Sequence, residues 1–365
     1  MTAVDALATA EGEPQGPRQA KPRSAGGGFG RYLLVRFLLI IPTIFILVTL
    51  VFFLMRLTGD PITAAQGGRL SADQLAELRA EAGYDRPILV QYLEYLGQIL
   101  VLDFGTTLTT NRPVFEVLAT YGPATFELVF YSLIVAFAVG IPLGLLAAYH
   151  RDKPQDAIFR VLAIYWYAVP VFFAGLILKL IFSVWLKWLP VAGRADVDSE
   201  IAMQLLPNRT GFYTIDAIMT GDPEVIGDVL AHAVLPAIAL GLLTAGIFLR
   251  LVRTNVIGTL NTDYVDAARS RGVRESRLLR KHAYRPALIP IITVIGLQIA
   301  LLLGGAVLTE TTFEWKGLGF ILARFLESRD FVAVQGIVAL LAVIVAITNF
   351  LVDIIAAFVD PRVRY

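Results

Sequence analysis

Residues 33–55 read L-L-V-R-F-L-L-I-I-P-T-I-F-I-L-V-T-L-V-F-F-L-M, and this stretch decides the fold class of the chain. A helix of about 20 apolar residues is long enough to cross the hydrocarbon core of a membrane. One charged side chain, Arg36, interrupts the stretch near its start. Five further apolar stretches follow near residues 124–148, 158–183, 231–252, 287–309 and 332–358. The sequence therefore predicts an all-α integral membrane protein with six transmembrane helices.

The composition of the whole chain supports this prediction. Of 365 residues, 56% are hydrophobic and 17% are charged, which is far from the usual balance of a soluble domain. The absence of cysteine excludes disulfides, thiolate metal sites and cysteine nucleophiles. The three histidines, His150, His232 and His282, show no metal-ligand spacing, and the sequence contains no phosphate-binding P-loop. We therefore expect no catalytic residue, no metal site and no cofactor in this chain.

Basic residues concentrate in alternate connections between the predicted spans. With the N-terminus placed inside, most of the 31 Lys and Arg fall in inner segments, whereas most of the 30 acidic residues fall outside. Because cytoplasmic segments carry an excess of Lys and Arg, both termini are expected in the cytoplasm. The inner basic residues are Arg18, Lys21, Arg23, Arg31, Arg36, Arg151, Lys153, Arg160, Arg250, Arg253, Arg269, Arg271, Arg274, Arg277, Arg280, Lys281, Arg285, Arg362 and Arg364.

The segments outside the predicted spans differ in character. Residues 1–30 are polar and rich in Gly, Pro and Ala, which predicts a disordered cytoplasmic tail rather than a signal peptide. In the outer loop 56–123, a capping Ser71 precedes leucines at helical spacing, and a second apolar stretch follows Pro87, which predicts two short surface helices. The outer loop 184–230 is polar and acidic, which is typical of an insertion or of a docking segment for a partner.

The inner loop 253–286 carries the most specific pattern. Asn261 is expected to cap a helix in which Tyr264, Ala267, Ala268 and Arg271 share one stripe. Gly272 is expected to end this helix, and a second helix is predicted over 274–284. Such an element suits insertion into a groove of a cytosolic partner. The alternative is a basic loop that only anchors the topology.

Small and charged residues inside the predicted spans carry further expectations. Gly140 and Gly144 are four residues apart, with Pro142 between them, and this spacing predicts a close helix crossing. A second close crossing is predicted at the small residues Gly304, Gly305 and Ala306. Lys179 is expected to snorkel outward. Asp353 is expected either to reach the inner interface or to pair with a neighbouring span. Glu127 and Glu310 are expected to face water or a polar cavity. So few charges argue against a proton relay.

Several of these motifs resemble one family. D-A-A-R-S-R-G (266–272) resembles the E-A-A-x-x-x-G coupling motif of ABC importer permeases, with Asp266 in place of Glu. The wider loop is similar to that of the dipeptide/oligopeptide/nickel branch, although Pro286 and Pro290 fall later than the proline of the general motif. Four further motifs resemble this branch, namely R-L-T-G-D-P (56–61), Y-D-R-P-I-L-V-Q-Y-L (84–93), D-F-G (103–105) and V-D-P-R-V-R-Y (359–365).

The resemblance implies a role for the chain and a set of partners. Residues 31–365 would form a non-catalytic permease domain that imports di- or oligopeptides by alternating access, in the cell membrane of a bacterium. Its partners would be a second related permease, two ATPase subunits or domains that hold ATP and Mg²⁺, an extracytoplasmic peptide-binding receptor and membrane lipids, but no nucleic acid. The coupling contacts to the ATPase would be Asp263, Tyr264, Asp266, Ala267, Ala268, Arg269 and Gly272, while the substrate-binding residues stay unassigned.

Two alternatives remain open at this point. The same ABC role could serve nickel, glutathione or another small solute. A secondary transporter with ion-coupled uptake is the alternative from another class, although it would need coupling residues at the midplane and repeated halves.

Overall fold

The computed structural model describes residues 28–57, 59–68 and 70–359, and helices make up most of this part of the chain. Four of the described helices are long and apolar enough to cross a membrane, and two bent helix pairs raise the number to six when each counts as one span. This confirms the predicted all-α membrane fold. The four long helices are α1 (Gly28–Leu57), α5 (Val114–Tyr149), α10 (Pro223–Leu260) and α15 (Phe331–Val359).

The remaining helices are the bent pairs and the shorter elements at the ends of the bundle. One bent pair is α6 (Pro154–Ala168) with α7 (Val171–Leu178) and the π-helix η1 (Lys179–Trp185), and the other is formed by the two halves of α13 (Tyr284–Phe313). The shorter elements are α2 (Pro61–Gln66), α3 (Ala72–Glu81), α4 (Ile88–Leu100), α8 (Val197–Gln204), α9 (Tyr213–Thr220), α11 (Asp263–Ser270), α12 (Glu275–Arg277), η2 (Leu278–Ala283) and α14 (Leu318–Glu327).

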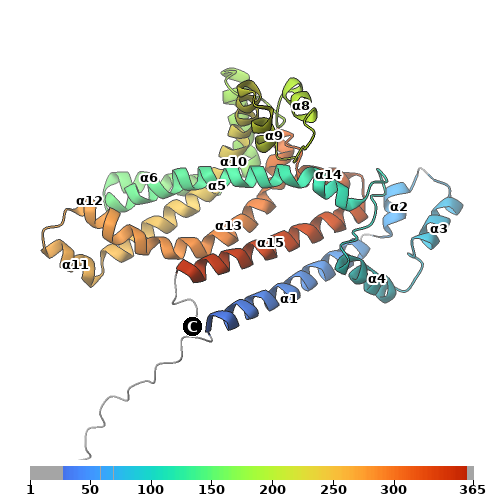
Figure 1. Ribbon diagram of the computed structural model, residues 1–365, viewed down its shortest axis with the longest axis horizontal. Coiled ribbons are helices and arrows are strands. Elements are labelled where there is room, and N and C mark those ends of the chain that lie inside the picture. The colour runs from blue at the N-terminus through green and yellow to red at the C-terminus, as the bar shows by residue number, and fades with distance from the viewer. Residues whose placement is uncertain (1–27, 58, 69, 360–365) are drawn as a thin grey trace, which may run out of the picture.

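The short helices gather at opposite ends of the bundle (Figure 1). Helices α11 and α12 project at one end, α2, α3 and α4 lie at the other, and α8 and α9 form a separate protrusion. Helix α1 begins and α15 ends toward the side that carries α11, and these two long helices pack against each other. Both ends of the described chain therefore lie toward the same side of the bundle.

The two longest helices extend well beyond the predicted spans. Helix α5 has 36 residues and α10 has 38. At 1.5 Å per residue they are about 54 and 57 Å long, against about 30 Å of hydrocarbon. Parts of the predicted loops are therefore helical, namely 114–123 and 223–230 of the outer loops and 253–260 of the inner loop.

The third predicted span is not one straight helix. Helices α6 and α7 meet at an angle of 102°. Pro170 has no backbone N–H and disfavours helical geometry in the residue before it, and Val169 accordingly takes an extended conformation with ψ 126°. The apolar run 158–183 hid this break, because hydropathy alone does not register a single proline.

Small residues let α5 and α10 pack closely, as Gly140 and Gly144 predicted. A Cβ on Gly140 would lie 2.7 Å from the carbonyl oxygen of Ala245, and one on Gly144 would lie 2.8 Å from that of Leu249. From α10, a Cβ on Gly241 would lie 2.7 Å from the carbonyl oxygen of Ser132. Real Cβ atoms do not approach other atoms so closely, so only glycine permits this helix separation. The close crossing expected at Gly304 is wrong, since its Cβ position has no described atom within 4 Å.

We expect Gly241→Ala to destabilise the protein by about 1–3 kcal/mol, because the added methyl group would meet the α5 backbone. Gly227→Ala, on the same helix, is the matched control. The Cβ position of Gly227 has no described neighbour within 4 Å, so alanine should stabilise the helix by roughly 0.5–1 kcal/mol. The midpoint of unfolding of the purified protein in detergent measures both changes. Equal shifts for the two variants would contradict the close packing of α5 and α10.

The first outer loop contains the two helices that its sequence predicted. The Ser71 side chain accepts a hydrogen bond from the Gln74 backbone N–H at the start of α3, and the Ser71 backbone N–H donates one to the side-chain oxygen of Gln74. Helix α4 packs on α1, where the Tyr92 hydroxyl lies 2.6 Å from that of Thr49. The predicted tail 1–30 lies outside the described residues, except that residues 28–30 begin α1.

Two charged residues within the spans form specific contacts. Lys179 does not snorkel freely, because its Nζ donates a 2.8 Å hydrogen bond to the carbonyl oxygen of Thr312 at the C-terminal end of α13. A cation is favourable there because unpaired carbonyl groups and the helix dipole give that end a partial negative charge. Asp353 pairs with Arg36 of α1 at 3.0 Å, which confirms the pairing with a neighbouring span.

Candidate functional site

Helix α11 begins one residue later than its sequence suggested. Thr262, not Asn261, occupies the N-cap position, and Asn261 instead ends α10. The Asn261 side-chain oxygen accepts a 3.1 Å hydrogen bond from Arg151, in the connection between α5 and α6. Asp263 and Asp266 lie in the first turn of α11, where acidic side chains complement the helix dipole.

Gly272 ends α11 in a left-handed conformation. Its φ is +79°, its N–H donates to the carbonyl oxygen of Arg269, and the N–H of Val273 donates to that of Ala268. This pair of hydrogen bonds is a Schellman motif, which satisfies the last carbonyl groups of a helix and favours glycine at this position. The predicted helix–glycine–helix element is therefore present, with α12 and η2 forming its second part.

The residues carried over from the family motif lie mostly on the exposed face of α11. Val265 is fully buried and anchors α11 against the inner end of the bundle, with Leu260 and Leu278 in the same cluster. Ala268 packs partly against this cluster, whereas Ala267 is exposed, so the alanine pair does not form one outward stripe. The exposed members of the predicted set are Asp263, Tyr264, Asp266, Ala267, Arg269 and Gly272.

Arg269 forms ion pairs within α11 and with α12. Its guanidinium pairs with Asp266 of the same helix and donates a 2.7 Å hydrogen bond from Nε to Glu275. The hydrogen bond with Glu275 raises the pKa of Arg269, so this cation stays charged at any physiological pH. Because these side chains are exposed, the ion pairs contribute little stability, and they connect α11 to α12 across Gly272.

A buried carboxylate connects the base of this loop to α6. Asp156 is 1% exposed and accepts two hydrogen bonds from Arg253 of α10, at 2.6 and 2.7 Å. The sequence analysis did not identify this pair, because its partners are 97 residues apart. The available signal was Asp156, an acidic residue in the first turn of a helix, in an inner segment that also holds Arg151, Asp152 and Lys153. This pair therefore joins α6 to α10 near the start of the loop that carries α11.

We expect Gly272→Val to strain the left-handed turn by roughly 1–2 kcal/mol and to loosen α11 relative to α12. Gly272→Asn is the matched control, because asparagine tolerates this conformation. Limited proteolysis of the purified protein within 263–283 checks the prediction, with faster cleavage for Gly272→Val than for Gly272→Asn. Equal cleavage rates for these two variants would show that the turn does not depend on the conformation of Gly272.

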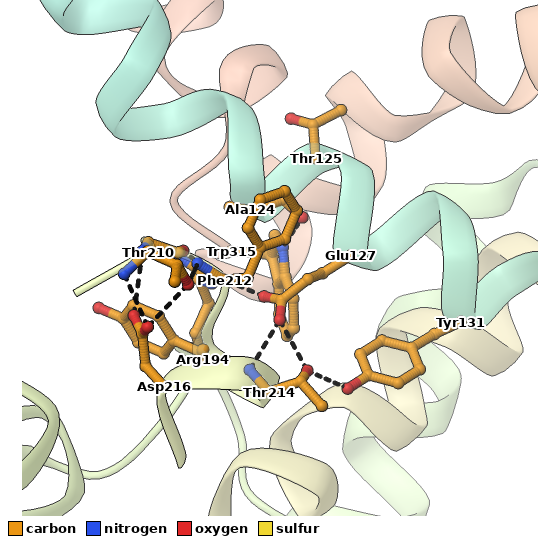
Figure 2. A network of polar contacts seen from close by, with 12 residues as sticks. Ala124, Thr125, Glu127, Tyr131, Arg194, Thr210, Phe212, Thr214, Asp216 and Trp315 are labelled. Carbon is orange, nitrogen blue, oxygen red and sulfur yellow. Dashed lines mark hydrogen bonds and ion pairs between the residues drawn. The ribbon is translucent and has the colours of Figure 1, made fainter. Parts of the chain in front are cut away.

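A second polar cluster lies beside the N-terminal half of α5 (Figure 2). Glu127 is 6% exposed and pairs with Arg194 of the second outer loop at 2.5 Å, and its other oxygen accepts hydrogen bonds from the backbone and hydroxyl of Thr214. The guanidinium of Arg194 also lies over the ring of Tyr213, 3.6 Å from its centroid. Of the two surroundings expected for Glu127, water or a polar cavity, the structure excludes water, since the carboxylate is buried among polar partners. The second outer loop folds into the bundle through this pair.

Glu310 is also buried and does not face water. Its carboxylate accepts hydrogen bonds from the hydroxyl of Thr125 at 2.6 Å and from the backbone of Phe320 at 2.9 Å. Phe320 lies in the first turn of α14, so Glu310 satisfies a free N–H at the start of that helix. A Cβ on Gly317 would overlap the Glu310 carboxylate. Glu127 and Glu310 thus accept bonds from fixed donors, which makes them structural anchors for α5, α14 and the outer loop.

Two family descriptions match the chain. The description "Binding-protein-dependent transport system inner membrane component" matches residues 140–365, and its N-terminal companion matches residues 29–129. Together they include the spans, the first outer loop and the α11–α12 element.

Characterised relatives align over nearly their whole length. The chain is 38% identical to the di/tripeptide transport system permease protein DppB of Pseudomonas aeruginosa, over 90% of this chain and 96% of that protein. It is 38% identical to the dipeptide transport system permease protein DppB of Escherichia coli, over 92% and 99%. Identity to the glutathione transport system permease protein GsiC of Salmonella choleraesuis is 33%, over 92% and 99%. The chain therefore belongs to the inner-membrane permease family of binding-protein-dependent transport systems, as a multi-pass, non-catalytic subunit that works with ATPase and binding-protein partners.

Proposed function

We propose that this chain is a permease subunit of an ABC importer that takes up di- or oligopeptides. The names of the relatives described above support the substrate class, since two act on dipeptides or tripeptides and glutathione is itself a tripeptide. The chain contributes spans to the translocation path and the receptor supplies selectivity. Nickel and other small solutes are the alternative cargo of the same machinery.

The observation that carries the coupling role is the exposed face of α11. Asp263, Tyr264, Asp266 and Ala267 face away from the bundle, while Val265 anchors the helix from behind. Such a face fits a groove on an ATPase subunit, where Arg269 and Gly272 set its angle and Ala268 supports it. ATP-driven closure of the ATPases then moves α11, and the Arg253–Asp156 pair carries this motion to α6 and α10.

The orientation and the assembly follow from the same proposal. Docking to a cytosolic ATPase requires α11 in the cytoplasm, and α1 begins and α15 ends toward the side of α11 (Figure 1). The excess of Lys and Arg in the inner segments supports this orientation, in which both termini are cytoplasmic. Residues 31–365 then act as one permease domain after a cytoplasmic tail. A second, related permease would complete the translocation path, and α6 offers it or lipid an apolar face with Ile158, Val161 and Ile164 more than 60% exposed.

Reconstitution tests the function directly. The complete transporter, purified with its receptor and placed in liposomes without an ion gradient, should take up a labelled dipeptide only when ATP is present on the ATPase side. Unlabelled dipeptides should compete with the label, whereas Ni²⁺ should not. Uptake driven by an imposed ion gradient, with no need for ATP, would instead establish the secondary-transporter alternative. Competition by glutathione but not by dipeptides would reassign the substrate within the same mechanism.

A further inference from the structure

Three side chains that the transport proposal does not use meet at the outer end of α10. Asp228 and His232 lie one helical turn apart on α10, and Asp196 comes from the segment that leads into α8. One ligand atom from each residue lies within 4.8 Å of the others. Sequence spacing did not point to this cluster, because Asp196 and Asp228 are 32 residues apart.

The hydrogen bond of His232 determines which ring nitrogen is available as a ligand. Its Nδ1 lies 2.9 Å from the backbone carbonyl oxygen of Asp228 and 3.0 Å from Oδ1 of the same residue. Both oxygens can only accept, so Nδ1 carries the proton. In the neutral ring Nε2 then keeps its lone pair. It forms no hydrogen bond among the described residues and faces Oδ1 of Asp196 at 3.6 Å. A nearly buried histidine fixed through Nδ1 to a carbonyl group and open at Nε2 is the usual arrangement of a metal-ligating imidazole.

The two carboxylates lack a cationic partner. Within the described residues, neither Asp196 nor Asp228 forms an ion pair with Lys or Arg. Arg194, two residues before Asp196, is already paired with Glu127. Oδ2 of Asp228 accepts a 2.8 Å hydrogen bond from the backbone of Asp196, which holds the two acidic residues together. With neutral His232 the cluster has a charge of about −2, which one divalent cation would neutralise.

We propose that Asp196, Asp228 and His232 form a binding site for a divalent first-row transition metal ion of the Zn²⁺ class. One imidazole nitrogen and two carboxylate oxygens are ligands that this class accepts, and an ion about 2 Å from each of Nε2 and Oδ1 fits the 3.6 Å gap between them. Asp196 is largely exposed and can adjust to the ion, while water completes the coordination. The bound ion fastens the segment before α8 to α10. A proton on Nε2 is the competing occupant, and it would give an ion pair with Asp196.

Calorimetric titration of the full-length protein in detergent tests the site. The protein carries an affinity tag without histidine, is first stripped with a chelator, and is then titrated with ZnCl₂ or MgCl₂. We expect one saturable Zn²⁺ site per chain and no comparable Mg²⁺ binding. Asp196→Asn should weaken Zn²⁺ binding by at least about tenfold, whereas the nearby exposed control Asp198→Asn should leave it unchanged.

Two further variants keep the test decisive. His232→Gln should also weaken Zn²⁺ binding, although its burial can affect folding, which is why the exposed Asp196 carries the main comparison. His150→Gln, at the far end of α5, should leave the affinity unchanged and measures adventitious binding to another histidine. Equal Zn²⁺ affinity in wild type and Asp196→Asn, or no saturable binding in wild type, would overturn the proposal and leave the proton as the occupant. Neither result bears on peptide uptake, so the transport proposal is tested separately.

Discussion

Arg194→Met should lower the free energy of unfolding by about 3–5 kcal/mol, because it leaves the buried carboxylate of Glu127 without its cation. Arg194 and Glu127 are 5% and 6% exposed, so water cannot replace the lost partner. Methionine retains much of the apolar stem of arginine, which limits the cavity left in the structure. The second outer loop should detach from α5, since Arg194 also binds the carbonyl oxygen of Gly211.

The midpoint of unfolding in detergent and proteolysis within 194–222 measure this effect. Arg209→Met is the matched control, because Arg209 belongs to the same loop but is exposed and forms no ion pair among the described residues. The double variant Glu127→Gln/Arg194→Met should recover part of the stability, as it removes the unpaired charge. An unchanged midpoint for Arg194→Met would mean that the loop is an external insertion, as its polar sequence had allowed.

Ala267→Arg should abolish ATP-dependent uptake while leaving the chain folded. Ala267 is exposed on α11, so a long side chain does not disturb the core of this chain, and arginine is nearly as good a helix former as alanine. In the proposed complex the same side chain would enter the ATPase groove. Loss of a central contact costs 2 kcal/mol or more, which corresponds to roughly 30-fold weaker docking.

Uptake in proteoliposomes and copurification of the ATPase measure this loss. Ala267→Ser, which is small and polar, should keep most of the activity and serves as the control for substitution at this position. Ala268→Leu should behave differently, because Ala268 packs toward the bundle and a larger side chain there should lower stability as well. Normal uptake by Ala267→Arg would exclude this face of α11 from coupling.

Features that depend on neighbouring residues were predictable from the sequence. The apolar stretches, the Ser71 cap and the turn at Gly272 are set within a few residues, and the structure contains each of them. The close approach of α5 and α10 was partly visible, because Gly140 and Gly144 lie on one face of a helix at spacing four. Pro170 offered a signal for the bend between α6 and α7 that the continuous apolar run concealed.

Contacts between distant segments could not be predicted in the same way. Arg194 and Glu127 are 67 residues apart, and the sequence gives no rule that pairs an outer-loop arginine with a glutamate near the end of a span. The same holds for Asp156 with Arg253. The prediction of Asn261 as the cap of α11 was wrong for a similar reason. Thr262 can cap a helix as well, and Asn261 accepts a hydrogen bond from the distant Arg151 instead.

Site-specific cross-linking tests the central claim that α11 couples this permease to an ATPase. The chain contains no cysteine, so Ala267→Cys introduces a single thiol on the exposed face of α11, and Asp198→Cys places one at the opposite, outer side as a control. In the assembled transporter, a short thiol cross-linker should join Cys at 267, but not at 198, to the ATPase subunit, with a yield that changes when ATP is added. Labelling at 267 by a membrane-impermeant reagent from outside the cell, with no cross-link to the ATPase, would contradict the account.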